Sequence, residues 1–383
     1  MQFKDIVGQP EVKKRLLKAY TEKRIPHAMI FTGPSGTGKL AMAIAFAQLV
    51  CCQNPTENDS CGTCPSCKKY SKIIHPDLHF AFPVNESKKE SADDKVSKSS
   101  GDHLSKWREC LLENPYFTEA EWYEAIGLDN KQGIISVSES SEVIKKISLK
   151  SFESEYKTMI IWLPERMNVN ASNRLLKLIE EPPLNTLFIL ISEDPNLVIK
   201  TILSRCQLIR FAPLTRESIS SALIERFQLN PAKAHEYSRV ANGNFAVAQK
   251  LAEGDSDNIY FLMFRDLMRL CFLRDVPGAL EWAEKAAALN RERQKELLTE
   301  ALRLTRESMV LNSKMDDIAY LAGDELQFGE RFSPQMPPDR AMQVYQLLNT
   351  AIGDIARNGN GQIIFTDTVL KLLKVMFPIK TLP

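Results

Sequence analysis

The sequence predicts an α/β domain with a parallel β-sheet, followed by a region built of helices. Three observations support this class. Short apolar runs, typical of parallel strands buried on both faces, occur at residues 28–31, 159–163 and 187–191. An amphipathic helical pattern over residues 171–181 lies between the second and third runs, as expected where strands and helices alternate. After Pro213 the strand patterns disappear, and helical spacing dominates the rest of the chain.

Composition is that of an ordinary globular protein and excludes several other classes. Hydrophobic residues make up 44% and charged residues 25% of the 383 residues, which excludes a mainly disordered or collagen-like chain. The sequence has neither an apolar run of the roughly 20 residues that span a bilayer nor an N-terminal signal pattern, so we expect a cytoplasmic protein with no membrane partner. The net charge is +1, so any contact with nucleic acid has to come from a local patch or an assembly.

A glycine-rich loop follows the first predicted strand and precedes a helical pattern over residues 40–49. The loop has the sequence GPSGTGK, which contains Gly33, Gly36, Gly38 and Lys39. Such glycines let backbone N–H groups surround an anion, and the N-terminus of the next helix adds positive potential. The lysine would reach the outer phosphates of a nucleotide. These four residues are therefore a candidate nucleotide-binding loop.

The residues that normally hold magnesium beside such a loop are missing. Leu40 stands where a Ser or Thr hydroxyl would bind the metal. Trp162 and Leu163 end the strand that should supply one carboxylate for magnesium and one for the attacking water. Glu165 lies beyond a proline, and we expect it to point elsewhere. This pattern argues against hydrolysis and leaves the binding of ATP open.

Five of the eight cysteines are crowded into residues 51–67, which in a chain without a secretion signal indicates a metal site before disulfides. Cys61, Cys64 and Cys67 follow one another at two-residue spacings, and Cys52 precedes them. Four thiolates in this pattern are typical of a structural zinc site. Cys51 is the alternative fourth ligand. Iron–sulfur ligation is the alternative chemistry, although the fourth-ligand spacing and the lack of a proline directly after the last cysteine weigh against it.

A polar segment interrupts the domain after the cysteines. Residues 85–106 are dominated by Ser, Lys, Asp and Glu, and we expect a mobile surface insertion there. Residues 107–126 are rich in aromatic side chains, so the second half of the insertion, about 85–130 in all, is expected to pack against the rest of the protein. The aromatic side chains are those of Trp107, Tyr116, Phe117, Trp122 and Tyr123.

Several motifs resemble those of the bacterial clamp-loader family of AAA+ proteins. They are the stretches VGQ at residues 7–9, PHA at 26–28, NRLLKLIEEPP at 173–183 and ILSRC at 202–206, together with the cysteine module placed after the loop helix. The resemblance implies an AAA+ P-loop domain over residues 1–212 that carries a zinc module at 51–68. It also implies a helical lid domain over 213–253 and an all-α collar domain for oligomerisation over 254–383.

At three positions the sequence departs from the motor subunits of this family. In these departures it resembles another branch, the delta-prime subunits, which are arms of the clamp loader that do not hydrolyse ATP. The motor subunits, gamma/tau, have Thr or Ser after the loop lysine, Asp-Glu at the end of a strand, and an arginine in the lid. Leu40, Trp162-Leu163 and Ala246 stand in those places here. The resemblance implies gamma/tau and delta as partners, and contact with the sliding clamp and primer–template DNA through the complex.

The resemblance also implies a role for Arg205 in the Ser-Arg-Cys motif. In the family this arginine faces the nucleotide of a neighbouring subunit, so Arg205 is expected to act in trans as an arginine finger. The planar guanidinium suits this role because it pairs with phosphate oxygens and stays charged. Ser192 lies at the family's phosphate-sensing position and is expected to be vestigial.

Two other functions remain as alternatives at this point. The first is an active motor ATPase of the gamma/tau type, which the missing magnesium residues oppose. The second is a nucleic-acid binder that uses the zinc module and an inert P-loop domain, which the net charge of +1 does not favour.

Overall fold

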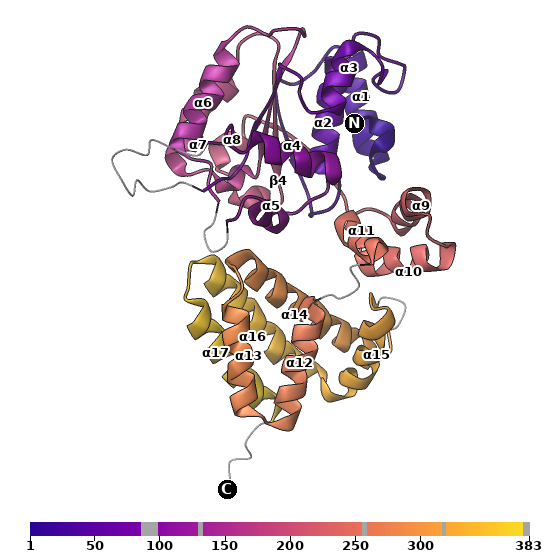
Figure 1. Cartoon of the computed structure of the whole chain (residues 1–383), viewed down its shortest axis with the longest axis vertical. Coiled ribbons are helices and arrows are strands. Elements are labelled where there is room, and N and C mark those ends of the chain that lie inside the picture. The colour runs from indigo at the N-terminus through magenta and orange to yellow at the C-terminus, as the bar shows by residue number, and fades with distance from the viewer. Residues whose placement is uncertain (86–98, 129–132, 255–258, 316–318, 378–383) are drawn as a thin grey trace. The chain divides into compact units, whose positions relative to one another are not determined.

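The computed structural model describes residues 1–85, 99–128, 133–254, 259–315 and 319–377 (Figure 1). Contacts divide the chain into two compact units. The first holds the sheet and nearly all described residues up to 249, and the second holds the described residues from 250 onward together with 235–240.

The first unit is built on a sheet that, among the described residues, has five parallel strands in the order β2-β3-β4-β1-β5. All residues of the three central strands are buried, as the apolar runs predicted. Because the strands are parallel, their carboxyl ends meet at one edge of the sheet. The strands are β1 (Ala28–Thr32), β2 (Leu78–Ala81), β3 (Lys157–Trp162), β4 (Thr186–Ser192) and β5 (Gln207–Arg210).

Helices cover both faces of this sheet. Alternate strand residues belong to two apolar clusters, one shared with α1 (Pro10–Thr21) and α2 (Lys39–Val50), the other with α6 (Val137–Ser148) and α7 (Val169–Glu180). Helix α2 is buried along its whole length, which explains its Ala-rich pattern with only Lys39 and Gln48 as polar residues. The predicted helices over 40–49 and 171–181 are confirmed as α2 and α7. Shorter elements of the unit are α3 (Pro65–Ser71), α8 (Lys200–Leu203) and 3₁₀ turns at Phe3–Asp5, Pro164–Arg166 and Pro195–Leu197.

The second half of the predicted insertion packs into the core, as expected. It forms α4 (Leu104–Glu113) and α5 (Glu119–Ala125), and its five aromatic side chains are all buried. The ring of Trp107 stacks on Phe82 at 4.2 Å and meets Trp122 edge-on at 5.0 Å. Arg166 forms a two-pronged ion pair with Glu119, with both N–O distances at 2.7 Å, which ties α5 to the end of β3. The insertion is thus part of the same core as α2.

Of the segment predicted as a mobile surface insertion over 85–106, residues 86–98 lie outside the described residues. Residues 99–106 are exposed or half-buried, as expected at a surface, with the exception of Ser100. Ser100 is buried, and its backbone N–H donates to Glu139 of α6 at 2.8 Å. Its hydroxyl donates to the same carboxylate. A buried carboxylate needs such donors. These two hydrogen bonds hold the segment before α4 against α6.

The remaining described residues form helices, as the sequence predicted. Within the segment predicted as a lid are α9 (Arg216–Phe227), α10 (Pro231–Ala241) and α11 (Phe245–Glu253). In the second unit, α14 packs against α16 and α13 against α17 around an apolar core. The division of the helical part into lid and collar domains stays a prediction. The helices of the second unit are α12 (Ile259–Leu273), α13 (Val276–Ala287), α14 (Arg291–Asn312), α15 (Gly323–Phe332), α16 (Pro338–Ala356) and α17 (Gly361–Met376), with a 3₁₀ turn at Ser333–Gln335. None of the described helices is long and apolar enough to cross a membrane.

Candidate functional site

The glycine-rich loop joins the carboxyl end of β1 to the N-terminus of α2. Gly36 and Gly38 have φ angles of 69° and 83°, in the left-handed region that glycine adopts without strain. At Gly33, a side-chain Cβ would lie 2.3 Å from the carbonyl oxygen of Phe211. The loop therefore needs these glycines for its own backbone path, whether or not an anion is bound.

Lys39 folds back onto this loop. Its Nζ donates to the carbonyl oxygens of Gly33 at 2.7 Å and Pro34 at 2.5 Å. Burial lowers the pKa of Lys39 to about 8, and the nearby carboxylates of Glu193 and Glu165 oppose that shift. The loop carbonyls of Gly33 and Pro34 thus satisfy the ammonium.

The positions that would hold magnesium belong to the apolar core. Leu40 is 5% exposed and Trp162 is 6% exposed, and both lie in the cluster that contains the aromatic side chains of the insertion. The Trp162 ring lies 5.2 Å from Trp107 and 5.3 Å from Phe117. An octahedral magnesium ion needs oxygen ligands and several waters. These residues do not fit that ion.

Trp162→Asp is expected to destabilise the protein, without creating a metal site, because it would put a carboxylate into the aromatic cluster. Loss of a buried tryptophan costs about 3–5 kcal/mol, and an unpaired buried charge adds to that. Phe152→Asp is the matched control, because Phe152 is 80% exposed and its replacement should change the free energy of unfolding by less than about 0.5 kcal/mol. Urea unfolding followed by circular dichroism compares the two. Equal stabilities would contradict the placement of Trp162 in the core.

Glu165 lies at the same edge of the sheet, which differs from the expectation that it points elsewhere. Leu163 has a left-handed φ of 57°, and the 3₁₀ turn that follows brings Glu165 back to the end of β4, where its Oε1 accepts a hydrogen bond from the Glu193 N–H at 3.1 Å. Burial raises the pKa of Glu165 to about 7, while hydrogen bonds from the backbone act in the opposite direction. Its Oε2 is buried without a hydrogen-bond partner in the described structure. The sequence could not reveal this position because it depends on the left-handed turn.

Two segments that the sequence did not connect with the loop cover it. The first is the start of α11, where the N–H of Phe245 donates to the Gly36 carbonyl at 3.0 Å and the Asn244 side chain occupies the space beside Gly36. The second is the insertion. A Cβ at Gly38 would lie 3.1 Å from the Tyr116 ring, and that ring lies 5.0 Å from the Phe245 ring. The aromatic residues of the insertion were the only signal of this contact.

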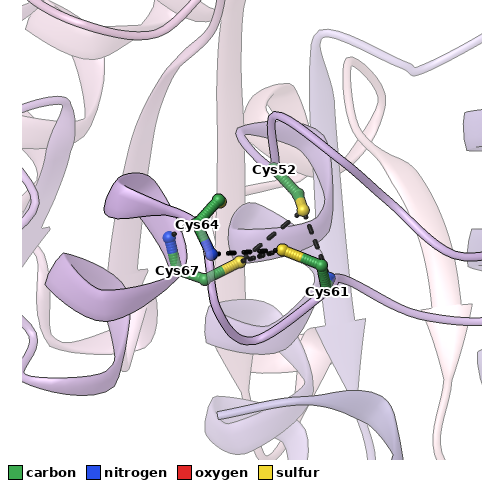
Figure 2. Close-up of side chains that lie close together, drawn as sticks. All are labelled: Cys52, Cys61, Cys64 and Cys67. Atoms are coloured by element: carbon green, nitrogen blue, oxygen red, sulfur yellow. Dashed lines mark hydrogen bonds between the residues drawn. The ribbon is translucent and has the colours of Figure 1, made fainter.

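The four cysteines predicted as metal ligands come together at the end of α2 and the start of α3 (Figure 2). Their sulfur atoms all lie within 4.8 Å of one another. The Sγ atom of Cys67 lies 3.6 Å from that of Cys52 and 3.9 Å from that of Cys61. In a tetrahedral site with Zn–S bonds of about 2.3 Å, sulfurs lie about 3.8 Å apart. The cluster therefore fits one tetrahedral ion such as zinc.

Backbone donors prepare these sulfurs for a metal. The N–H groups of Cys61, Cys64 and Cys67 each point at the sulfur of the preceding cysteine of the set, at 3.3–3.4 Å. Hydrogen bonds, first that from the N–H of Cys64, lower the pKa of the Cys61 thiol to about 5, whereas burial raises the pKa of the Cys52 and Cys67 thiols. An iron–sulfur cluster spreads its thiolates over several iron atoms and needs a wider arrangement of sulfurs.

Cys51, the alternative fourth ligand, lies outside this cluster. Its sulfur accepts a hydrogen bond from the Tyr70 hydroxyl at 3.3 Å. Burial raises the pKa of the Cys51 thiol to about 11. The choice between Cys51 and Cys52 could not be made from spacing, because the two are adjacent in sequence.

Arg205 follows α8 and precedes β5, and it lies apart from the loop residues on the surface. Its side chain is 33% exposed and forms an ion pair with Glu180, with Nε 3.1 Å from Oε2. Its Nη1 donates to the Thr201 carbonyl at 3.0 Å. The structure thus places the half-buried guanidinium at the end of α7.

Comparisons with known proteins agree with these features. The DNA polymerase III subunit delta' of Bacillus subtilis (strain 168) is 30% identical over 248 residues, which are 64% of this chain and 60% of that protein. Subunit delta' of Escherichia coli (strain K12) is 23% identical over 286 residues, or 74% of this chain and 70% of that protein. Subunit tau of Bacillus subtilis (strain 168) is 26% identical over 253 residues, or 66% of this chain and 35% of that protein.

The matches thus span less than two thirds of the Bacillus subtilis relatives. A solved gamma subunit-related protein of Thermotoga maritima superposes with a TM-score of 0.42 at 12% identity, covering 95% of this chain and 99% of that chain. The family described as DNA polymerase III, delta subunit, matches residues 8–215, which is more than half of the chain. With its parallel α/β core, its glycine-rich loop and its cysteine cluster, the chain belongs to this DNA polymerase III clamp-loader family.

Proposed function

We propose that the protein is a subunit of the DNA polymerase III clamp loader that does not hydrolyse ATP itself. In this role it helps to place a sliding clamp on primer–template DNA in the cytoplasm, with the gamma/tau and delta subunits as partners. Family membership supports the clamp-loader role. The single observation that carries the non-hydrolysing role is the burial of Leu40 and Trp162 in one apolar cluster, at the two positions where magnesium would need oxygen ligands.

The state of the loop lysine supports the same role. Lys39 is held by two loop carbonyls, and the loop is covered by α11 and by Tyr116. A nucleotide would have to displace these contacts, so binding through Gly33, Gly36, Gly38 and Lys39 is expected to be weak. Sequence identity alone does not distinguish a delta' subunit from a gamma/tau subunit, since tau is matched at 26% and delta' at 30%. The residues at the metal positions therefore argue against the alternative of an active gamma/tau-like motor.

Two further parts complete the proposal. The zinc held by Cys52, Cys61, Cys64 and Cys67 is structural, because all four sulfurs converge on one ion and leave no ligand position for a substrate. Arg205 acts in trans on the nucleotide of a motor neighbour. Its exposure at the end of α7 and its fixed charge support this role.

The isolated protein is expected to show no ATPase activity above background, since magnesium and the attacking water have no carboxylate at residues 162 and 163. Added to the gamma/tau and delta subunits, it should co-purify with them and support ATP hydrolysis that DNA and clamp stimulate. Steady-state phosphate release measures both. Magnesium-dependent turnover by the isolated chain that disappears in Lys39→Ala would overturn the non-hydrolysing role.

A further inference from the structure

We infer that Glu180 is a positioning residue for Arg205, an assignment that rests on the trans-acting role proposed above. Glu180 ends α7, and Arg205 follows α8, which packs against α7. The Nη2 atom of Arg205 donates to Oε1 of Glu180 at 3.3 Å. Its Nε faces Oε2 at 3.1 Å without the alignment of a hydrogen bond. The carboxylate thus lies along the side of the guanidinium that carries Nε and Nη2.

A second contact fixes the plane of the guanidinium group. Nη1 donates to the Thr201 carbonyl at 3.0 Å, so each terminal nitrogen makes one hydrogen bond within the chain. Each terminal nitrogen carries two N–H groups, so each keeps one for a partner. Two N–H groups on neighbouring nitrogens form the fork that pairs with two phosphate oxygens. Glu180 and Thr201 therefore orient the guanidinium, and each of its terminal nitrogens has a second N–H group that a phosphate could use.

The ion pair is poorly suited to stabilising the fold. The side chains of Arg205 and Glu180 are 33% and 54% exposed, and solvent-exposed pairs of this kind contribute about 0–1 kcal/mol. Helix α7 is held by other residues, such as the buried Leu175 and Ile179. The main effect of the pair is therefore on the orientation of a long, flexible side chain, whose entropy would otherwise be lost when a phosphate binds.

The experiment uses the reconstituted clamp loader with four variants of this subunit: Glu180→Gln, Arg205→Ala, the double variant, and Glu181→Gln. Glutamine keeps the shape of Glu180 and removes the negative charge that forms the ion pair with Arg205. Glu181 is the matched control, because it is the exposed neighbour in the same Glu-Glu pair and the ion pair is made by Glu180. Each subunit is first checked by circular dichroism and by its recovery in the complex.

Glu180→Gln is expected to lower kcat for ATP hydrolysis at the site facing this subunit by about 10-fold, because misplaced catalytic groups lose rate steeply. KM for ATP should stay within about twofold, and Glu181→Gln should match the unmodified assembly. In the Arg205→Ala background the same change should have no further effect, since its target is gone. A purely structural role would instead lower the rate in both backgrounds.

The remaining outcomes separate this inference from the proposal beneath it. An Arg205→Ala assembly that keeps the unmodified rate overturns both the trans-acting role and the role of Glu180. An assembly in which Arg205→Ala lowers the rate but Glu180→Gln does not overturns the positioning role alone. A higher rate with Glu180→Gln would show a restraining contact and also overturns it.

Discussion

Arg205→Ala in this subunit is expected to lower both the ATPase rate and the clamp-loading rate of the reconstituted clamp loader, while the subunit still folds and joins the complex. Arginine fingers contribute about 10³–10⁵ in rate at the site they face. The total rate falls only in part, because other motor sites keep their own arginines. Folding should persist because the side chain is 33% exposed and its ion pair lies at the surface.

Two further variants make this test specific. Arg205→Lys should rescue poorly, because an ammonium keeps the charge but loses the planar fork. Arg210→Ala is the control, since Arg210 is an exposed arginine on the edge strand β5, close by in sequence. An assembly with Arg205→Ala that hydrolyses ATP and loads clamps at the unmodified rate would remove the trans-acting role.

Cys64→Ser is expected to release zinc and to unfold the segment between α2 and α3. Structural zinc sites in small domains supply about 10–16 kcal/mol of apparent binding free energy. Loss of one thiolate therefore removes much of the free energy that stabilises this segment. Other contacts hold the segment in part, because the Gln48 amide donates to the Ser60 hydroxyl at 2.9 Å. We therefore expect local loss of amide protection over residues 52–67 while the sheet stays folded. Hydrogen exchange and elemental analysis measure the two effects.

Cys51→Ser is the matched control for the metal site. The Cys51 sulfur accepts a hydrogen bond from Tyr70 and lies outside the cluster, so this variant should keep about one zinc per chain. Zinc lost from Cys51→Ser but kept by Cys64→Ser would overturn the ligand set. Iron found in protein purified without chelator would overturn the choice of metal.

The sequence predicted the centre of the fold well and its edges poorly. The strands β1, β3 and β4 are apolar throughout, because both of their faces are buried, and this made them recognisable. Strand β5 was missed, since three of its four residues are exposed or only half-buried and no apolar run forms. Strand β2 was missed because it is short and contains His79.

The candidate site divides in the same way. The cysteines were predictable because all four ligands lie in one short stretch of chain. The contacts of Tyr116 with Gly38 and Phe245 were not, because they join three segments far apart in sequence. Glu165 was misplaced because one left-handed residue reverses the direction of the chain. Local sequence patterns predict neither contacts between distant segments nor a reversal of chain direction at a single residue.

The aromatic core beside the loop makes polar residues at positions 40 and 162 costly for folding. Thr at position 40 and Asp at position 162 would each put a polar group into a cluster that Trp107 and Phe117 now fill. Each of these replacements alone would therefore lower the free energy of unfolding and would not by itself create a metal site. A metal site could be built at this edge only by several coordinated changes, in which the aromatic side chains that fill the volume are replaced together with residues 40 and 162.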